Sequence, residues 1–245
     1  EKNKSDPTED AMLIKYLPLK SVYSLVYKDQ GYKTVDKYYI DVSENFIQDF
    51  ILPSEKKLYI SQEYYEKLLQ KFKNNLIEII NNDYKKGFIN SLLELIKTTL
   101  YYVPSSVEEN ERDISLYLHS KLTACVAASM YDFLSCNQEN YSYREYLFDK
   151  EQNNKKQFKE EQAFLMASVD LSGIQKFIYT ITTEQAQKQL RARSIYLELI
   201  MENLIDEILN NLGYSRCNLL YSGGGHCYIL IGNTENNKDE FKEII

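Results

Sequence analysis

Apolar residues recur at helical spacing through the first half of the chain, and this pattern predicts three helices. The first begins after Ser61, which suits an N-cap, and the second covers about residues 87–100. The third begins at Asp113 or Ser115 and ends near Leu134. The inward positions expected of the first two helices are Tyr64, Leu68, Phe72, Leu76, Ile79, Phe88, Leu92, Leu95 and Ile96.

The segments around these helices follow other patterns. From Leu19 to Val42, short apolar runs alternate with polar residues, which predicts short strands. Residues 135–160 are polar and charged and are the best candidate for a linker. Within the third helix, small side chains would let a neighbouring element approach closely; they are Thr123, Ala124, Ala127 and Ala128.

After the polar stretch the pattern becomes that of a small sheet with helices. A compact apolar run predicts a buried strand, and a long amphipathic stretch ending at Gly213 predicts a helix. The predicted elements are a strand at 163–169, helices at 174–181 and 184–212, strands at 217–221 and 227–231 around a turn at 222–225, and a last helix capped by Thr234. The apolar face expected of the long helix comprises Leu190, Leu197, Ile200, Leu204, Ile208 and Leu212.

This order of elements places the chain in the α+β class. Strand, two helices, two strands and a helix make up most of a ferredoxin-like palm, in which only the closing strand is missing. A sheet cut at that point has an unpaired edge, so we expect the natural protein to continue beyond Ile245. We expect a mainly helical region over residues 1–140, a linker at 141–160 and the incomplete palm over 161–245.

Composition narrows the possible partners and ligands. Apolar residues make up 44% of the chain, which permits a packed core, and the net charge of -7 means that contact with RNA or DNA needs a local basic patch or a partner subunit. No apolar run approaches membrane-spanning length and no secretory signal is visible, so we expect no membrane contact. The four cysteines form no C-x-x-C pair, which argues against structural zinc and for a reducing, cytoplasmic compartment.

The first candidate site follows the predicted strand at 163–169. Asp170 places a carboxylate at the crevice where α/β sheets bind ligands. Ser172 and the backbone N–H of Gly173 lie at a helix start, which suits a phosphate group. In the alternative interpretation Asp170 and Ser172 only cap the helix, and the sequence leaves both open.

The second candidate site is the turn between the last two strands, formed by Ser222, Gly223, Gly224, Gly225 and His226. Three consecutive glycines let the backbone adopt positive φ and approach a ligand closely. A tight hairpin alone is satisfied by one or two glycines, so the third favours close approach. His226 either contacts a phosphate or base or is a hairpin histidine with ordinary partners.

Two further segments contain candidate residues. Arg191 and Arg193 project in different directions from the long helix, so they do not form one fork. One of them can face a phosphate while the other pairs with an acid, and Ser194 belongs to the same segment; the alternative is a solvated basic face. His119 is the single histidine of the first half, and we expect it to be structural.

Four ordered motifs resemble the large subunit of type III-A CRISPR interference complexes. They are DISLYLHSKLTA at 113–124, SVDLSGIQKFIY at 168–179, LRARSIYLE at 190–198 and NLLYSGGGHCY at 218–228, and YVPSS at 102–106 also fits. One departure concerns His119, because Leu118 stands where the family usually has Asp. The carboxylate that would orient this histidine is therefore missing.

The resemblance implies antiviral defence by a multi-subunit complex. In that family an N-terminal HD-type domain cuts single-stranded DNA, and two palm domains together bind ATP with Mg²⁺ or Mn²⁺. The second palm holds metal ions on a Gly-Gly-Asp-Asp hairpin and makes cyclic oligoadenylates. Target RNA that pairs with the guide RNA switches both activities on, so the implied partners are other subunits, guide RNA, target RNA and single-stranded DNA.

For this chain, the resemblance implies the rear part of the HD-type domain followed by the first palm alone. Gly225 and His226 stand where the catalytic palm has two acids, and Asp170 is the one acid at the expected metal position. Two-metal chemistry needs several carboxylates, so we expect neither catalytic nor metal-binding residues here and no nuclease activity of the chain alone. The residues expected to form half of an ATP site are Asp170, Ser172, Gly173, Arg191, Arg193, Ser194, Ser222, Gly223, Gly224, Gly225 and His226.

Two other functions compete with this one. A non-catalytic scaffold would use the same fold only to dock neighbouring subunits and guide RNA, with a purely structural glycine turn. A stand-alone nucleotidyl cyclase of the diguanylate type would share the palm layout, but the absence of acids after Gly224 argues against it. Whether the whole protein keeps both the nuclease and the cyclase activity stays open.

Overall fold

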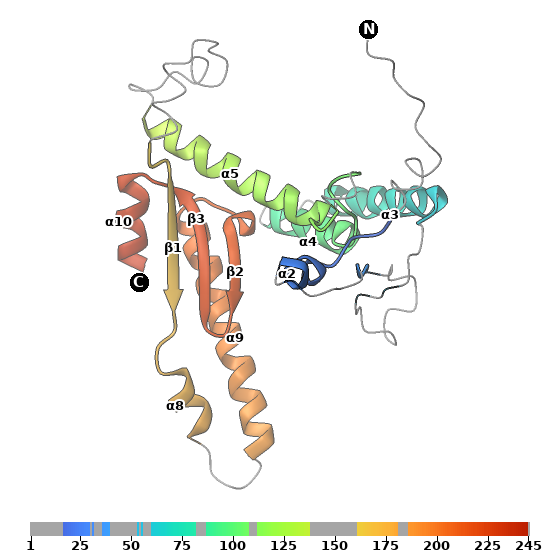
Figure 1. The fold of residues 1–245 in the computed structure, drawn as a ribbon. Coiled ribbons are helices and arrows are strands. Elements are labelled where there is room, and N and C mark those ends of the chain that lie inside the picture. Colours follow the sequence, from blue (N-terminus) through green and yellow to red (C-terminus); the bar gives the residue numbers. More distant parts are fainter. Residues whose placement is uncertain are drawn as a thin grey trace. The chain divides into compact units, whose positions relative to one another are not determined.

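The computed structural model describes residues 17–29, 31, 36–39, 53, 55, 60–81, 87–107, 112–137, 161–180 and 186–244 (Figure 1). The chain forms two compact units, residues 1–121, called here the helical unit, and residues 122–245, called the sheet unit. Helices and a three-stranded antiparallel sheet confirm the α+β class. The predicted linker at 141–160 lies outside the described residues.

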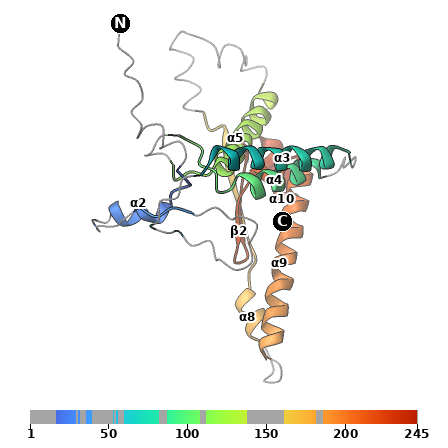
Figure 2. The same ribbon diagram turned by 90° about the vertical axis from the view of Figure 1, so that its right-hand side faces the viewer.

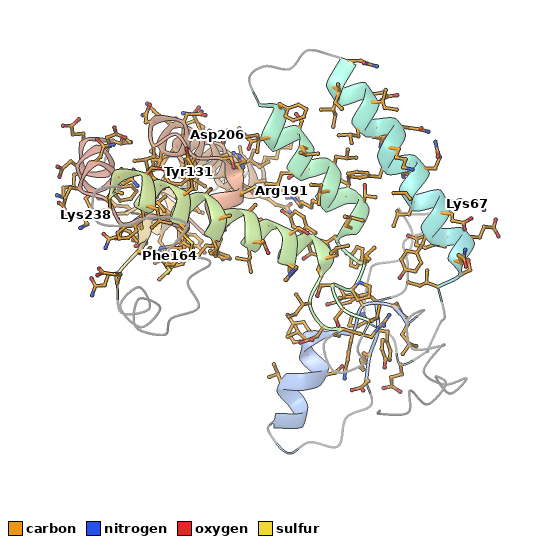
Figure 3. The ribbon with its side chains drawn as sticks, turned by 90° about the horizontal axis from the view of Figure 1, so that it is seen from above. Lys67, Tyr131, Phe164, Arg191, Asp206 and Lys238 are labelled. Atoms are coloured by element: carbon orange, nitrogen blue, oxygen red, sulfur yellow. The ribbon has the colours of Figure 1, made fainter. Side chains whose placement is uncertain are left out.

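The helical unit is built around two helices that lie side by side, α3 (Gln62–Asn81) and α4 (Phe88–Leu100) (Figure 2). The predicted cap of α3 is confirmed, because the Ser61 hydroxyl accepts a hydrogen bond from the Tyr64 backbone N–H at 3.2 Å. On α3, Lys67 projects on the side away from α4, where it pairs with Glu63 at 2.8 Å (Figure 3).

The strands predicted near Leu19 are wrong in part, because Val22–Asp29 forms helix α2. Only a single antiparallel bridge, between Lys20 and Tyr38, appears in the described part of this segment. The Ser24 hydroxyl accepts a hydrogen bond from the Lys37 N–H at 3.0 Å. The tertiary contacts of the segment therefore override the strand preference of its Val and Tyr residues.

Helix α5 (Leu116–Cys136) begins in the helical unit and continues into the sheet unit. The prediction that its small residues allow close packing placed the contact on the wrong face, because Ala124 and Ala127 are exposed. The close approach is made instead at Ser129, whose backbone oxygen would lie 2.8 Å from a Cβ at Gly232. The small residue that allows the close approach is therefore Gly232 on the sheet, and not an alanine on the helix.

The sheet consists of β1 (Phe164–Asp170), β2 (Leu219–Gly223) and β3 (His226–Gly232) in the order β1-β3-β2. The prediction placed β2 two residues too early. Arg216–Asn218 forms instead a short 3₁₀ turn, η2, in which the Ser215 hydroxyl accepts a hydrogen bond from the Cys217 N–H.

Three helices complete the sheet unit: α8 (Ile174–Tyr179), α9 (Ala186–Asn211) and α10 (Glu235–Ile244). Helices α9 and α10 cover one face of the sheet, where the core comprises Val169, Met201, Ile205, Ile208, Leu209, Leu212, Leu219, Cys227, Ile229 and Ile231. The predicted Thr234 cap is confirmed, since its hydroxyl accepts a hydrogen bond from the Asn237 N–H at 3.1 Å.

Only the second half of α9 lies over the core. A helix of 26 residues is about 39 Å long, whereas a strand of seven residues is about 23 Å long. Figures 1 and 2 show α9 extending beyond the β2–β3 turn with α8 beside the overhanging part. The predicted apolar face is therefore buried at Ile208 and Leu212 but exposed at Ile200.

Hydrogen-bonded side chains join α5 to the segment after α9 and to α10. Oδ2 of Asp132 accepts hydrogen bonds from the Tyr214 hydroxyl and from Nδ2 of Asn237, both at 2.6 Å. The Tyr214 hydroxyl also accepts a hydrogen bond from the Gly232 N–H. Burial, together with the hydrogen bond to Asp132, raises the pKa of Tyr214 well above its ordinary value. We call Asp132, Tyr214 and Asn237 the α5 clamp.

Burial predicts which thiol reacts first. Cys136 is exposed, whereas Cys125 and Cys227 are fully buried, and burial raises the pKa of the Cys227 thiol. Because the thiolate is the nucleophile, a maleimide should modify Cys136 faster than Cys125 or Cys227 by more than about tenfold. Peptide mass spectrometry over time measures this, with labelling in denaturant as the control. Equal native rates at Cys136 and Cys227 would show that the core opens readily.

Among the helices that the structure describes, none is long and apolar enough to span a bilayer.

Candidate functional site

The candidate site lies on the sheet face opposite α9 and α10, called here the open face. Side chains alternate along β1, so Phe164, Met166, Ser168 and Asp170 share this face. Helix α5 covers the end of the open face near Gly232, where a Cβ would meet Asp132, Ser129 and Phe133. The other end of the open face, at the β2–β3 turn, bears the residues that the sequence singled out.

The structure brings Asp170 and His226 together. They are partners in the register of β1 and β3, and Oδ1 of Asp170 lies 3.1 Å from Nδ1 of His226. Both side chains are more than half exposed. The third position of this row is Gly223, which pairs with His226 on β2. Asp170 and His226, 56 positions apart in the sequence, therefore form one exposed polar row that ends at Gly223.

The three consecutive glycines, Gly223, Gly224 and Gly225, differ in whether the fold requires a glycine at their position. Gly224 and Gly225 form a two-residue turn with φ of 62° and 85°, a conformation that glycine adopts readily. Gly225 also faces Ile174, and a Cβ there would lie 2.0 Å from Cδ1 of that side chain. Gly223 is in a strand without positive φ, so neither turn geometry nor a rigid neighbour requires it.

Gly223 has no side chain on the open face, and the ring of Tyr221 lies over it. A Cβ at this position would meet that ring, with the hydroxyl at 2.7 Å and Cζ at 3.1 Å. Tyr221 is 55% exposed, so its ring can rotate away, and a ligand reaches the strand backbone once it has done so. The surplus glycine expected from the sequence is therefore Gly223.

The loop before α8 is fixed by the glycine turn. The Leu171 N–H donates a hydrogen bond to the Gly225 carbonyl at 2.9 Å. The N-cap of α8 is Gly173, with φ of 78° and no side-chain cap. The structure therefore does not support the interpretation of Asp170 and Ser172 as helix caps, and it leaves Ser172 exposed beside the Asp170–His226 row.

The arginine segment is at a different place. Nη1 of Arg193 donates hydrogen bonds to the carbonyls of Phe177 and Thr180, and its guanidinium lies 5.2 Å from the centre of the Phe177 ring. Arg193 therefore closes the C-terminal end of α8. Arg191 and Ser194 are exposed on the overhanging part of α9, and no contact links either to the Asp170–His226 row in the described residues.

Two aromatic residues of the open face are not among the residues predicted from the sequence. Tyr221 and Tyr228 are partners in the register of β2 and β3, one row above Gly223 and His226, and their ring centroids are 6.2 Å apart. Strand alternation counted outward from the hairpin would have placed both on the face of His226.

A divalent metal ion does not fit this row alone. Asp170 is a single carboxylate, its oxygen is within hydrogen-bond distance of His226, and metal sites of the Mg²⁺ type need several oxygen ligands. Nowhere in the described ranges do three or more His, Cys, Asp or Glu side chains lie together as a metal-binding group. His119 is exposed on α5 and is not part of such a group.

Comparison with known proteins places these segments in one family. The model of the Csm1 subunit domain B matches residues 163–245. A CRISPR system single-strand-specific deoxyribonuclease Cas10/Csm1 (subtype III-A) from Enterococcus italicus is 38% identical over 228 residues, which cover 92% of this chain and 29% of the relative. Its counterpart from Streptococcus thermophilus is 46% identical over 172 residues, 70% of this chain and 22% of the relative. The chain thus spans less than a third of these relatives.

Solved structures agree with this assignment. The crystal structure of a Csm1-Csm4 cassette in complex with one ATP matches 96% of this chain, and 28% of its own chain, with a TM-score of 0.69 at 28% identity. Csm1 in T.onnurineus matches 94% of this chain, and 27% of its own, with a TM-score of 0.66 at 29% identity. The chain belongs to the Cas10/Csm1 family of type III-A CRISPR systems.

Proposed function

We propose that the sheet unit supplies one side of a nucleotide-binding site in the large subunit of a type III-A CRISPR effector. The observation on which the proposal rests is Gly223, a strand glycine that no turn geometry requires, in one row with His226 and Asp170. A glycine at such a position suits close approach of a ligand to the backbone. Support comes from solved relatives of the Csm1-Csm4 type in complex with one ATP and with pppApA.

The fold assignment that accompanies this proposal is a palm preceded by the rear part of an HD-type domain. The strand order β1-β3-β2 with α9 and α10 on one face is most of a ferredoxin-like arrangement. The helical unit then corresponds to the HD-type remainder. The expected limits of 1–140, 141–160 and 161–245 stay predictions, and α5 is the element that both units share.

Within this function the residues of this chain bind and orient the nucleotide. The backbone at Gly223 faces the phosphate groups once the Tyr221 ring has moved aside, and His226 is the polar residue paired with it on β3. Magnesium or manganese, bound with the nucleotide, would neutralise phosphate charge, and its ligands must come largely from elsewhere in the protein. The site formed here is therefore half of a pocket and does not catalyse phosphoryl transfer by itself.

Activities and partners of the whole protein belong to the same proposal. Relatives are described as single-strand-specific deoxyribonucleases, and solved Csm1-Csm4 cassettes contain cA4 or cA3. We propose that the complete protein cleaves single-stranded DNA, makes cyclic oligoadenylates and assembles with a Csm4-like subunit, guide RNA and target RNA.

A scaffold function is the second candidate, and one observation favours it. The turn geometry of Gly224 and the contact of Gly225 with Ile174 account for two of the three glycines without any ligand. In that case the open face would dock a neighbouring subunit, and Gly223 would only make room for Tyr221.

Replacing Gly223 by valine separates the two functions. Valine has a high strand preference, and its Cβ displaces only the half-exposed ring of Tyr221, so the variant should fold as well as the wild type. It should nevertheless lower the affinity for ATP with Mg²⁺ by about tenfold or more, because side-chain atoms fill the approach to the backbone. Isothermal titration of the full-length protein measures the affinity and the number of sites.

The matched control is Gly224→Asn at the neighbouring position. Asparagine tolerates positive φ, and a Cβ at Gly224 has nothing within 4 Å. This variant should bind ATP nearly as the wild type does. Unchanged affinity and stoichiometry in Gly223→Val would remove the nucleotide function from this face and leave the scaffold function.

A further inference from the structure

We propose that Tyr221 and Tyr228 form a stacking platform for the base of the nucleotide whose phosphate groups approach Gly223. The inference rests on the proposed function, since it assigns the base of the same ligand. It identifies residues that determine the affinity for the nucleoside part of the ligand. The polar residues of the Asp170–His226 row do not explain that affinity.

The first argument is that both tyrosine rings are exposed, on a sheet face that α5 covers at its other end. Tyr221 is 55% exposed and Tyr228 is 40% exposed, although the side chains on the opposite face of β3, those of Cys227, Ile229 and Ile231, are fully buried. Their neighbour on β1 in the same row is Ser168, a small side chain that leaves the Tyr228 ring accessible from that side. An aromatic pair left open in the middle of a sheet face is a feature of nucleic-acid-binding sheets, in which aromatic side chains stack on bases.

The second argument is distance along the strands. Residues two apart on one face of a strand are separated by about 7 Å. The tyrosine row therefore lies about 7 Å from the Gly223–His226 row, which matches the spacing between the base and the phosphate groups of a single nucleotide. A nucleotide with its phosphate groups at the turn can thus place its base over Tyr221 and Tyr228 without leaving the open face.

The third argument is chemistry. Tyrosine offers a flat π surface with little loss of conformational freedom on binding, and a purine covers more of this surface than a pyrimidine. The tilt of 39° between the two rings means that the base stacks on one ring and meets the other at its edge. Tyr228 is on the central strand β3 and is the less exposed of the two, so we assign it the stacking role. Tyr221, whose hydroxyl lies beside Gly223, reaches the ribose or the first phosphate group.

The test compares ATP, CTP and inorganic triphosphate, each with Mg²⁺, as ligands of the full-length protein. Tyr228→Leu removes the ring and keeps an apolar side chain, and Tyr228→Phe is the matched control that keeps the ring. We expect Tyr228→Leu to weaken ATP binding by about tenfold, to reduce the preference for ATP over CTP and to leave the affinity for inorganic triphosphate unchanged. Tyr228→Phe should bind all three ligands as the wild type does.

The outcomes separate this inference from the function on which it rests. If Gly223→Val weakens inorganic triphosphate binding and Tyr228→Leu leaves ATP binding unchanged, the phosphate site stands and the platform is refuted. If Gly223→Val changes neither ligand, the proposed function fails, and the platform fails with it. Equal losses for ATP and inorganic triphosphate in Tyr228→Leu would show a general disturbance of the sheet and would also refute the platform. Circular dichroism of each variant establishes that the sheet is intact.

Discussion

Replacing Asp132 by alanine is expected to lower the free energy of unfolding by about 3 kcal/mol, the largest effect of any single exposed or half-buried polar residue described above. Asp132 accepts hydrogen bonds from the Tyr214 hydroxyl and the Asn237 side chain, both at 2.6 Å. Without it, the Tyr214 hydroxyl loses its acceptor in a half-buried position, and the Asn237 amide loses the shortest of its three hydrogen bonds. The effect is large because hydrogen-bond donors that are shielded from water lose their acceptor and do not regain one from the solvent.

Urea denaturation of the chain, followed by circular dichroism, measures the change. Asp239→Ala is the matched control, because Asp239 is an exposed acid on α10 that pairs only with Lys242, three residues along. This control should change the free energy of unfolding by less than about 0.5 kcal/mol. A double-mutant cycle with Tyr214→Phe should give a coupling energy of about 1 kcal/mol or more. A loss in Asp132→Ala no larger than that of the control would show that α5 is held to the sheet by apolar contacts alone.

The α5 clamp shows where sequence reasoning ends. The helical period predicts α5 with its limits almost correct, but it places the packed face on the small residues, of which Ala124 and Ala127 are exposed. The contact that ties it to the sheet joins Asp132 to residues about 80 and 105 positions away. No local pattern reports a hydrogen bond between segments so distant, and an aspartate within a helix normally suggests a solvated face.

The candidate site was predictable to a larger extent, for a physical reason. Strand alternation and a two-residue hairpin fix the register of β2 and β3, and the apolar run before Asp170 fixes the face of β1. His226, Gly223 and Asp170 therefore lie in one row, and the binding of a nucleotide there stays a prediction. The sequence left open which of Arg191 and Arg193 faces a phosphate. Arg193 closes α8, because the free carbonyl groups at a helix C-terminus accept hydrogen bonds from a guanidinium.

The second large effect is expected at the neighbouring glycine, Gly225. Gly225→Asn should lower the free energy of unfolding by about 2 kcal/mol, whereas Gly224→Asn should lower it by less than about 0.5 kcal/mol. Both residues have positive φ, which asparagine tolerates, so backbone conformation contributes similarly to the two variants. The difference comes from Ile174: its Cδ1 would lie 2.0 Å from a new Cβ at Gly225 and has to rotate away, and its Cγ1 would still lie 3.4 Å from that Cβ, while nothing lies within 4 Å at Gly224.

A second-site change tests this explanation directly. Ile174→Ala removes the clashing atoms, so Gly225→Asn with Ile174→Ala should regain most of the stability lost by Gly225→Asn alone, as read from the urea midpoint of the double variant against each single variant. If the double variant loses the sum of the two single effects, the strain is in the backbone and the contact with Ile174 is incidental. Recovery would instead mean that Gly225 is present to let the turn pack against the start of α8. In that case two of the three glycines serve the fold, and only Gly223 remains for the ligand.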